Sequence, residues 1–395
     1  MEKEKNKENI SEKELKDKSF HKVKDKSRFK RLKKIILFLL ILIFFFSVKA
    51  GIYIANWQSL AKDMIYNSPS SVLDDSGKVI AQIGNSKKTK NVPLSDIPDN
   101  LKNAYISIED QRFYSHSGID IQRTSAAILN YVKNLGSSSF GGSSITQQLV
   151  KNLTGDSSST ITRKINEWIK AFTLEGVLEK DEILQAYFNI IYVGPNIYGV
   201  ELGANYYFDK KVSDLSLEEC AFLAGINNAP NSYNPFENNK NSEKIKSRTK
   251  TVLYKMNELG YINKESYDSA CKNVDTGLNF KQGKIDDTSK NNIYSYHTDS
   301  LLNEIIKDIS EKKNISMSFA NNYIEMAGLK IYSTQNTNIQ NLIEQELSKP
   351  KYVIKSQKDP SVTAQAAMVV MNHTNGQVLG CVRRNWKKRN FSRIK

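Results

Sequence analysis

The arrangement of apolar and polar residues predicts a membrane-spanning helix near the N-terminus. Residues 35–48 are apolar apart from Ser47, and the apolar character continues to residue 55, broken only by Lys49. A helix of about 20 residues spans a bilayer, so residues 35–55 are expected to form a transmembrane signal anchor. The basic run before it places the N-terminus in the cytoplasm by the positive-inside rule. A cleaved signal peptide is the alternative, but a charged leader of 34 residues is long for one.

Apolar spacing in the middle of the chain predicts helices. From residue 98 to about 275, apolar residues recur every three or four positions, most clearly in 161–178 and 181–191. Strand-like pieces such as 78–83 precede this block. We therefore expect one mainly α domain over residues 56–275.

The C-terminal part has a different pattern. A stretch rich in Asn, Lys and Ser predicts a linker over residues 276–328. Strand-like runs follow at 329–334 and 366–370, and Asn375-Gly376 after the second run is a hairpin signal. Residues 329–395 are thus expected to begin an α+β domain.

Charge is concentrated at the two ends of the chain. The formal net charge is +15, but residues 1–34 hold 14 Lys/Arg against 7 Asp/Glu, and residues 381–395 hold 7 Lys/Arg and no acid. About +1 is left for everything between. A nucleic-acid-binding domain should carry a basic stripe on its folded surface, so no nucleic-acid partner is expected. Residues 1–34 are interpreted as a cytoplasmic basic tail.

The three cysteines and four histidines are widely spaced and form no zinc-ligand pattern. We expect neither a structural metal nor a disulfide framework. Cys220 lies in the apolar run 220–224, which favours a buried and unreactive thiol.

Candidate chemistry lies in five short runs of the helical block. The first, residues 109–120, begins with Glu109 and Asp110 and continues to His116 and a glycine. A Glu-Asp pair alone is usually a solvated helix end.

The second run, residues 141–152, begins with Gly and Ser residues that suit a helix N-cap or an anion-binding nest. The alternative is an ordinary capped helix whose Gln147, Gln148 and Lys151 face water.

The third run, residues 163–167, places Glu167 one helical turn after two cations, as in an ordinary intrahelical ion pair. The fourth, residues 180–208, has the apolar spacing of a core helix, and the fifth, residues 248–256, that of an amphipathic helix.

Together and in this order, the five runs resemble the signature motifs of the peptidoglycan glycosyltransferases of glycosyltransferase family 51, the N-terminal half of class A penicillin-binding proteins. The first two runs match at Glu109, Asp110, Phe113, His116, Gly118 and Asp120, and at Gly142, Ser143, Ile145, Gln147, Gln148, Leu149, Lys151 and Asn152, with Ser144 where Thr is commoner. The next two match at Arg163, Lys164 and Glu167, and at Lys180, Ile183, Leu184, Tyr187, Asn189, Tyr192, Gly194 and Gly199. The resemblance covers roughly residues 56–380 and implies a lysozyme-like glycosyltransferase fold.

The resemblance also implies a reaction. The sugar 4-hydroxyl of lipid II attacks the anomeric carbon of a growing glycan strand that is still linked to undecaprenyl diphosphate. Glu109 matches the catalytic base, and Glu167 is implied as a second catalytic residue that orients the region or a divalent ion. By the resemblance this ion is Mg²⁺, carried mainly by the diphosphate. Substrate contacts are implied for Asp110, Phe113, His116, Ser143, Gln147, Gln148, Lys151, Asn152, Arg163, Lys164, Asn189 and Tyr192.

The implied location is the bacterial cell membrane, as a single-pass type II protein with an extracellular catalytic domain. Expected partners are lipid II, the growing glycan strand, the membrane and cell-wall synthesis proteins. Residues 126–132 are amphipathic, and in the family this neighbourhood dips into the membrane; a core helix is the equal alternative.

The C-terminal part departs from the family. Residues 328–334 and 365–379 resemble the first strands of a penicillin-binding transpeptidase domain, but the sequence stops before the Ser-x-x-Lys nucleophile motif of that domain. The run 247–250 fits the spacing only inside the fifth glycosyltransferase motif, and no Lys-Thr-Gly run exists. We therefore expect a truncated transpeptidase segment and no transpeptidation.

Two alternatives of other classes remain. A lysozyme-type hydrolase could use Glu109 and Glu167 as a carboxylate pair. A non-catalytic scaffold is the other, if the chain has kept only partner binding.

Overall fold

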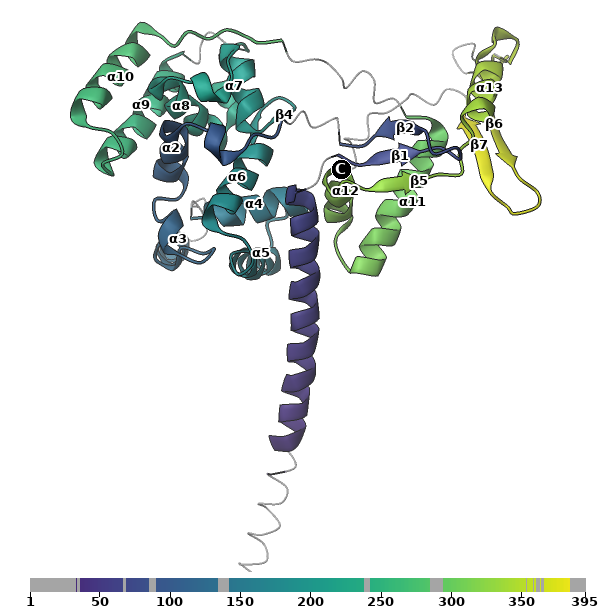
Figure 1. The fold of residues 1–395 in the computed structure, drawn as a ribbon, viewed down its shortest axis with the longest axis horizontal. Coiled ribbons are helices and arrows are strands. Elements are labelled where there is room, and N and C mark those ends of the chain that lie inside the picture. Colours follow the sequence, from purple (N-terminus) through teal and green to yellow (C-terminus); the bar gives the residue numbers. More distant parts are fainter. Residues whose placement is uncertain are drawn as a thin grey trace, which may run out of the picture. The chain divides into compact units, whose positions relative to one another are not determined.

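The computed structural model describes residues 33, 36–66, 69–84, 90–133, 142–237, 242–284, 294–352, 354–357, 359, 363 and 366–383 (Figure 1). The chain divides into two units, Met1–Trp57 and Gln58–Lys395, which are described separately. The predicted cytoplasmic tail lies outside the described residues apart from Lys33, and so does the basic C-terminus beyond residue 383.

The apolar N-terminal segment forms a helix, as predicted. The helix Ile36–Tyr66 has 31 residues and is, among the described residues, the one helix long and apolar enough to cross a membrane by length and composition. It continues past the expected end at residue 55 because residues 56–66 contain neither Gly nor Pro. In the second unit, Leu60, Ala61 and Met64 of this continuation are buried.

The predicted mainly α domain is confirmed. Its helices are α2 (Asp99–Glu109), α3 (Ile121–Lys133), α4 (Ile145–Thr154), α5 (Ile161–Leu174), α6 (Lys180–Ile190), α7 (Val200–Phe208), α8 (Leu217–Gly225), α9 (Ser242–Glu258) and α10 (Lys264–Thr276), with a small ribbon of β3 (Tyr192–Gly194) and β4 (Ile197–Tyr198).

Helix α8 is the centre of this domain. It packs against α2, α7, α9 and α10, and every residue from Glu219 to Gly225 is buried. Cys220 is fully buried here, as expected, and its burial raises the pKa of the thiol far above its usual range. Because α8 touches so many helices, it fixes the position of α2, whose last residue is Glu109.

A small sheet joins segments far apart in the sequence. Its strand order is β2 (Val79–Gln82), β1 (Ser71–Leu73) and β5 (Lys330–Tyr332) (Figure 1). Strand β1 pairs antiparallel with β2 and parallel with β5, so that Val72 lies opposite both Ala81 and Ile331.

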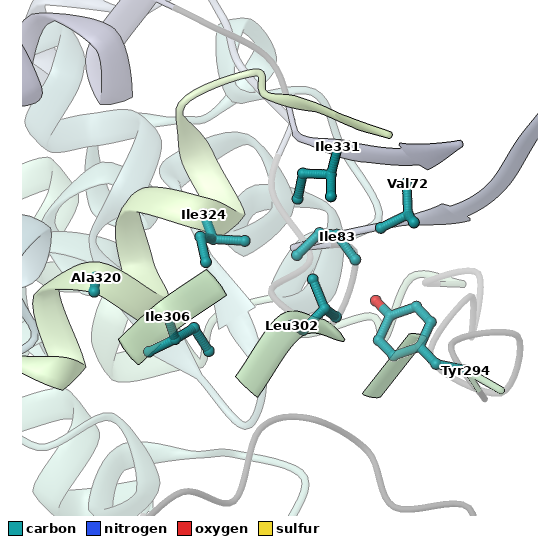
Figure 2. Packing of buried hydrophobic residues seen from close by; sticks show 8 residues of the cluster. All are labelled: Val72, Ile83, Tyr294, Leu302, Ile306, Ala320, Ile324 and Ile331. Atoms are coloured by element: carbon teal, nitrogen blue, oxygen red, sulfur yellow. The ribbon is translucent and has the colours of Figure 1, made fainter. Parts of the chain in front are cut away.

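Two helices cover this sheet where the sequence had suggested a linker over residues 276–328. They are α11 (Tyr296–Lys313) and α12 (Met317–Met326). Their apolar residues pack with those of the strands into one cluster, shown in Figure 2: Val72, Ile83, Tyr294, Leu302, Ile306, Ala320, Ile324 and Ile331. The apolar residues of these helices lie four positions apart and are separated by polar residues. The composition of the stretch alone therefore did not predict helices.

The C-terminal part contains the predicted hairpin. Strands β6 (Ala367–Met371) and β7 (Val378–Arg383) pair antiparallel around a turn in which Gly376 has a φ of 74°. Helix α13 (Thr337–Ser348) packs on β7, where the Gln340 amide bonds to both the backbone N–H and the carbonyl of Cys381. The predicted start of an α+β segment is therefore folded in this part.

Candidate active site

A cavity of about 470 Å³ brings together residues from α2, α3, α4, α5 and α9. Its lining contains most of the residues that the motifs singled out. They are Ile108, Glu109, Arg123, Ser143, Gln147, Gln148, Lys151, Asn152, Glu167, Ile191, Tyr192, Asn227 and Arg248.

Glu109 contributes its carboxylate to this cavity from the end of α2. Its Oε2 accepts a hydrogen bond of 2.8 Å from Gln148 Nε2, and its Oε1 accepts one of 3.0 Å from Asn227 Nδ2. The Arg123 guanidinium donates to the Glu109 backbone carbonyl, which is exposed because the helix stops here. Among the hydrogen bonds of the described residues, the Glu109 carboxylate is therefore held by two neutral amides and by no cation.

Asp110 lies beside Glu109 but points into the protein. Its side chain is fully buried, and both carboxylate oxygens lie 3.0 Å from His116 Nε2. One oxygen also accepts, at 2.9 Å, from the backbone N–H of Ile145, which is the first residue of α4. A carboxylate at a helix N-terminus is stabilised by the helix dipole, so Asp110 ties the first motif to the second.

Phe113 and His116 support the same buried network. Phe113 is fully buried, its ring lies edge-on to that of His116, and Lys180 Nζ lies 4.5 Å from its centroid. Gly118 has a φ of 80°, and a Cβ there would meet the Ala171 backbone at 2.6 Å. The structure places Asp110, Phe113 and His116 behind the cavity and not on its lining; their contact with a substrate stays a prediction.

The N-terminus of α4 forms the predicted cap. Ser144 Oγ accepts from the Gln147 backbone N–H at 3.1 Å, and Gln147 Oε1 accepts from the Ser144 backbone N–H at 2.9 Å. The Gln147 side chain is therefore used inside the protein, and only 1% of the residue is exposed. The alternative of a capped helix whose Gln147, Gln148 and Lys151 face water is right for the cap and for Lys151. It is wrong for the two glutamines, because Gln147 is buried and Gln148 bonds to Glu109.

Helix α5 carries the predicted ion pairs. The Glu167 carboxylate accepts from the Arg163 guanidinium and from the Lys164 ammonium group, and Glu167 is only 5% exposed. Lys164 Nζ also donates to Ser143 Oγ at 2.8 Å. Burial lowers the pKa of Lys164, although Glu167 opposes this effect. Glu167 thus gathers two cations beside the cavity.

The remaining predicted residues divide between two places. Asn152 and Lys151 line the cavity, and Lys151 is exposed. Tyr192 also lines it and donates to Asn231 Oδ1 at 3.0 Å. The Asn189 amide instead bonds to both backbone groups of Val92, at 2.9 and 3.0 Å, and borders a second cavity of about 310 Å³.

Three polar lining residues were absent from the predicted site. Arg123 and Asn227 both bond to Glu109, and Arg248 donates through Nε to the Gly225 carbonyl at 2.9 Å. Arg248 belongs to the fifth motif, so its position in the sequence could have identified it. No local pattern points to Asn227, which is 118 residues from Glu109.

Comparison with known proteins agrees with this geometry. Residues 76–257 match the family model of the transglycosylases. Penicillin-binding protein 1A of Clostridium botulinum (strain Langeland) is 37% identical over 320 residues, which cover 80% of this chain and 39% of that protein. Penicillin-binding protein 1A of Clostridium perfringens (strain 13) is 36% identical over 80% of this chain and 48% of its own length.

A more distant relative and a solved structure complete the comparison. Penicillin-binding protein 1A/1B of Bacillus subtilis (strain 168) is 34% identical over 78% of this chain and 33% of its own length. The chain thus spans less than half the length of these curated relatives. The crystal structure of penicillin-binding protein 1A from Haemophilus influenzae covers 74% of this chain and 32% of its own at 20% identity, with a TM-score of 0.30 that is too low to carry an argument. Residues 76–257, which include Glu109, Glu167 and the cavity that they line, therefore form a transglycosylase domain.

Proposed function

We propose that this chain is an inverting peptidoglycan glycosyltransferase that polymerises lipid II into β-1,4-linked glycan strands and releases undecaprenyl diphosphate. The observation that carries the proposal is the cavity in which the Glu109 carboxylate, held by two amides, shares the lining with Arg123, Lys151 and Arg248. A base and a group of cations are what this transfer requires.

Glu109 would act as the general base. A sugar hydroxyl is a weak nucleophile, and a carboxylate that takes its proton during the attack contributes about 100- to 10,000-fold to the rate. The new bond forms between the 4-oxygen and the anomeric carbon, and the bond to the diphosphate oxygen breaks with its electron pair. The proton goes to Glu109, and the configuration at the anomeric carbon is inverted.

The departing diphosphate gathers negative charge, which cations stabilise strongly in a confined site. Lys151 lines the cavity and is exposed, so we assign it the role of binding the diphosphate. Arg163 and Lys164 would strengthen the positive field while Glu167 holds them in place. Glu167 is thereby proposed to orient cations and not to act on the sugar.

The residues do not fit a protein-held metal ion. The part of the chain that the structure describes contains no group of three or more His, Cys, Asp or Glu side chains that could hold one. Glu167, the single residue expected as a weak ligand, gives its oxygens to Arg163 and Lys164. We therefore propose Mg²⁺ only as an ion that arrives with the diphosphate.

An apolar stripe on α5 supports work at a membrane surface. Ile161, Ile165, Ile169 and Phe172 lie on one face of the helix and are 81%, 46%, 42% and 59% exposed. Exposed apolar surface of this kind marks contact with another apolar phase. We propose that this face meets the bilayer that holds the polyprenyl substrate, in a single-pass protein whose catalytic domain is extracellular. Residues 126–132, for which immersion in the membrane and a core helix were equal alternatives, are helical. Their side chains from residue 128 on lie outside the described residues.

We also propose that this chain performs no transpeptidation. The Ser247 run with Ser-x-x-Lys spacing lies in α9 of the transglycosylase domain, and the sequence contains no Lys-Thr-Gly run. A labelled β-lactam should therefore leave the purified protein unstained, and a covalent adduct would contradict this proposal.

Polymerisation of purified lipid II tests the main proposal. The wild-type chain should produce glycan strands, and Glu109→Gln should lower the rate at least 100-fold because the amide accepts no proton. Equal rates in the two proteins would refute the role of Glu109. Release of soluble sugar fragments from finished cell wall would instead identify a hydrolase, and inactivity of the wild type in both assays would favour a scaffold.

A further inference from the structure

Asn227 lies outside the five motif runs and yet contacts the proposed base. It belongs to the short 3-10 helix η4 (Ile226–Asn228), which follows α8. Its Nδ2 lies 3.0 Å from Glu109 Oε1, 3.1 Å from the Tyr187 hydroxyl and 3.4 Å from Gln148 Oε1. An amide nitrogen has two protons, so one is donated to the carboxylate and the other is shared by the two remaining acceptors.

These contacts form a closed ring in which the donor and acceptor roles are mutually consistent. The Tyr187 hydroxyl donates to Gln148 Oε1 at 3.1 Å, which leaves the Gln148 NH₂ group to donate to Glu109 Oε2 at 2.8 Å. Burial, and after it the charge of Glu109, raise the pKa of Tyr187 well above its usual range, so the hydroxyl keeps its proton. With the opposite amide orientation, Asn227 Oδ1 would face the carboxylate and repel it.

The protein core fixes the distance between Asn227 and Glu109. Tyr105 lies one helical turn before Glu109, is fully buried and donates to the Leu223 carbonyl of α8 at 3.1 Å. Arg248 donates to the Gly225 carbonyl at the end of the same helix. Glu109, the last residue of α2, and Asn227, just after the end of α8, therefore lie at the ends of two helices that are bonded to each other.

We propose that Asn227 is a positioning residue for Glu109. Its N–H group holds one carboxylate oxygen, while the Gln148 amide holds the other. This inference rests on the proposed role of Glu109 as general base. A neutral donor suits that role, because a cationic partner would favour the ionised carboxylate more strongly and make it a weaker proton acceptor.

Other ionisable groups surround Glu109 and contribute to the electrostatic potential at its carboxylate. Those in contact with it, beside it or on the shared lining are Tyr105, Asp110 with His116, Arg123, Lys151, Glu167, Tyr187 and Arg248. Of these groups, Tyr187 is the one that also bonds to Asn227, and burial keeps its pKa well above the usual range, so a shift of the acid limb reports the amide lost from Glu109.

The test uses the full chain and lipid II polymerisation between pH 5 and 9. Asn227→Ala should lower kcat about tenfold with KM within twofold, and move the acid limb of the rate profile to higher pH by roughly one unit, because a hydrogen bond to a charged group has about this worth. Asn227→Asp keeps the shape but replaces the donor by a second carboxylate, so it should move the limb further. Asn273→Ala, which removes an exposed amide bonded to Glu218, is the control and should match wild type.

Two results would overturn the proposal. One is an acid limb that stays at the wild-type pH in both Asn227 variants, even if kcat falls, because a merely structural residue would give that pattern. The other is a kcat within twofold of wild type in both. Glu109→Gln, measured in parallel, separates the proposals: if it keeps wild-type activity, the base assignment fails, and if it is inactive while both Asn227 variants keep the wild-type limb, only the inference on Asn227 fails.

Discussion

Asp110→Asn tests whether the buried carboxylate beside Glu109 holds the first two motifs together. The carboxylate accepts from His116 Nε2 and from the Ile145 N–H, at 3.0 and 2.9 Å, and is fully buried. An Asn side chain keeps one acceptor oxygen, and because both oxygen positions lie 3.0 Å from His116 Nε2, its NH₂ group must face that donor. A buried donor left without an acceptor costs about 1–3 kcal/mol. The lost charge at the N-terminus of α4 costs roughly 0.3–2 kcal/mol more.

The two effects together predict a destabilisation of about 2–4 kcal/mol. For a domain of 150–250 residues, each kcal/mol lowers Tm by about 2–4 °C, so a fall of roughly 5–15 °C is expected in a thermal melt. The matched control is Asp268→Asn, the same chemical change in an exposed pair with Lys264 at 2.7 Å. An exposed pair of this kind contributes little to stability because water screens it. If Asp110→Asn melts no lower than Asp268→Asn, the reasoning about this network is wrong.

Three further predictions concern other parts of the chain. Glu167→Gln leaves Arg163 and Lys164 close together without their carboxylate, so lipid II polymerisation should fall about tenfold or more, and an unchanged rate would contradict the orienting role of Glu167. Burial raises the pKa of Asp299 in α11 from its usual 3.8 to about 6, so ionisation of this group destabilises the fold as pH rises through that range. Asp299→Asn should therefore raise Tm at pH 7.5 and have no effect near pH 4, and an equal gain at both values would contradict this cause. Calorimetric titration of Mg²⁺ into the substrate-free protein should show no saturable site below about 1 mM, since Mg²⁺ on phosphate needs few protein ligands; a tight site would refute the absence of a protein-held ion.

The sequence predicted the features that depend on neighbouring residues. The pairs of Glu167 with Arg163 and Lys164 follow from helical spacing, and the hairpin follows from Asn375-Gly376. The spacing Ser144-x-x-Gln147 is also that of a capping box, a local signal that would have assigned the Gln147 side chain to the helix cap.

Features that depend on contacts through space were not predicted. Gln147 and Gln148 are adjacent and of one type, yet one caps a helix and the other holds Glu109. Their roles depend on where α2 and α6 lie, which the spacing within α4 does not encode. The same holds for Asn227, and for α11 and α12, whose apolar faces became recognisable only against the strands that they cover.

The parallel pairing of β1 with β5 has a consequence for the order in which the protein folds during synthesis. Residues 71–73 leave the ribosome early, but their partners are residues 330–332. At about 5–20 residues per second, these partners follow roughly 13–50 seconds later. The β1–β2 pair can form at once, whereas the third strand arrives only after the whole transglycosylase domain has been made. Throughout that interval one edge of β1 stays open, and the domain between the two strands must fold without the completed sheet.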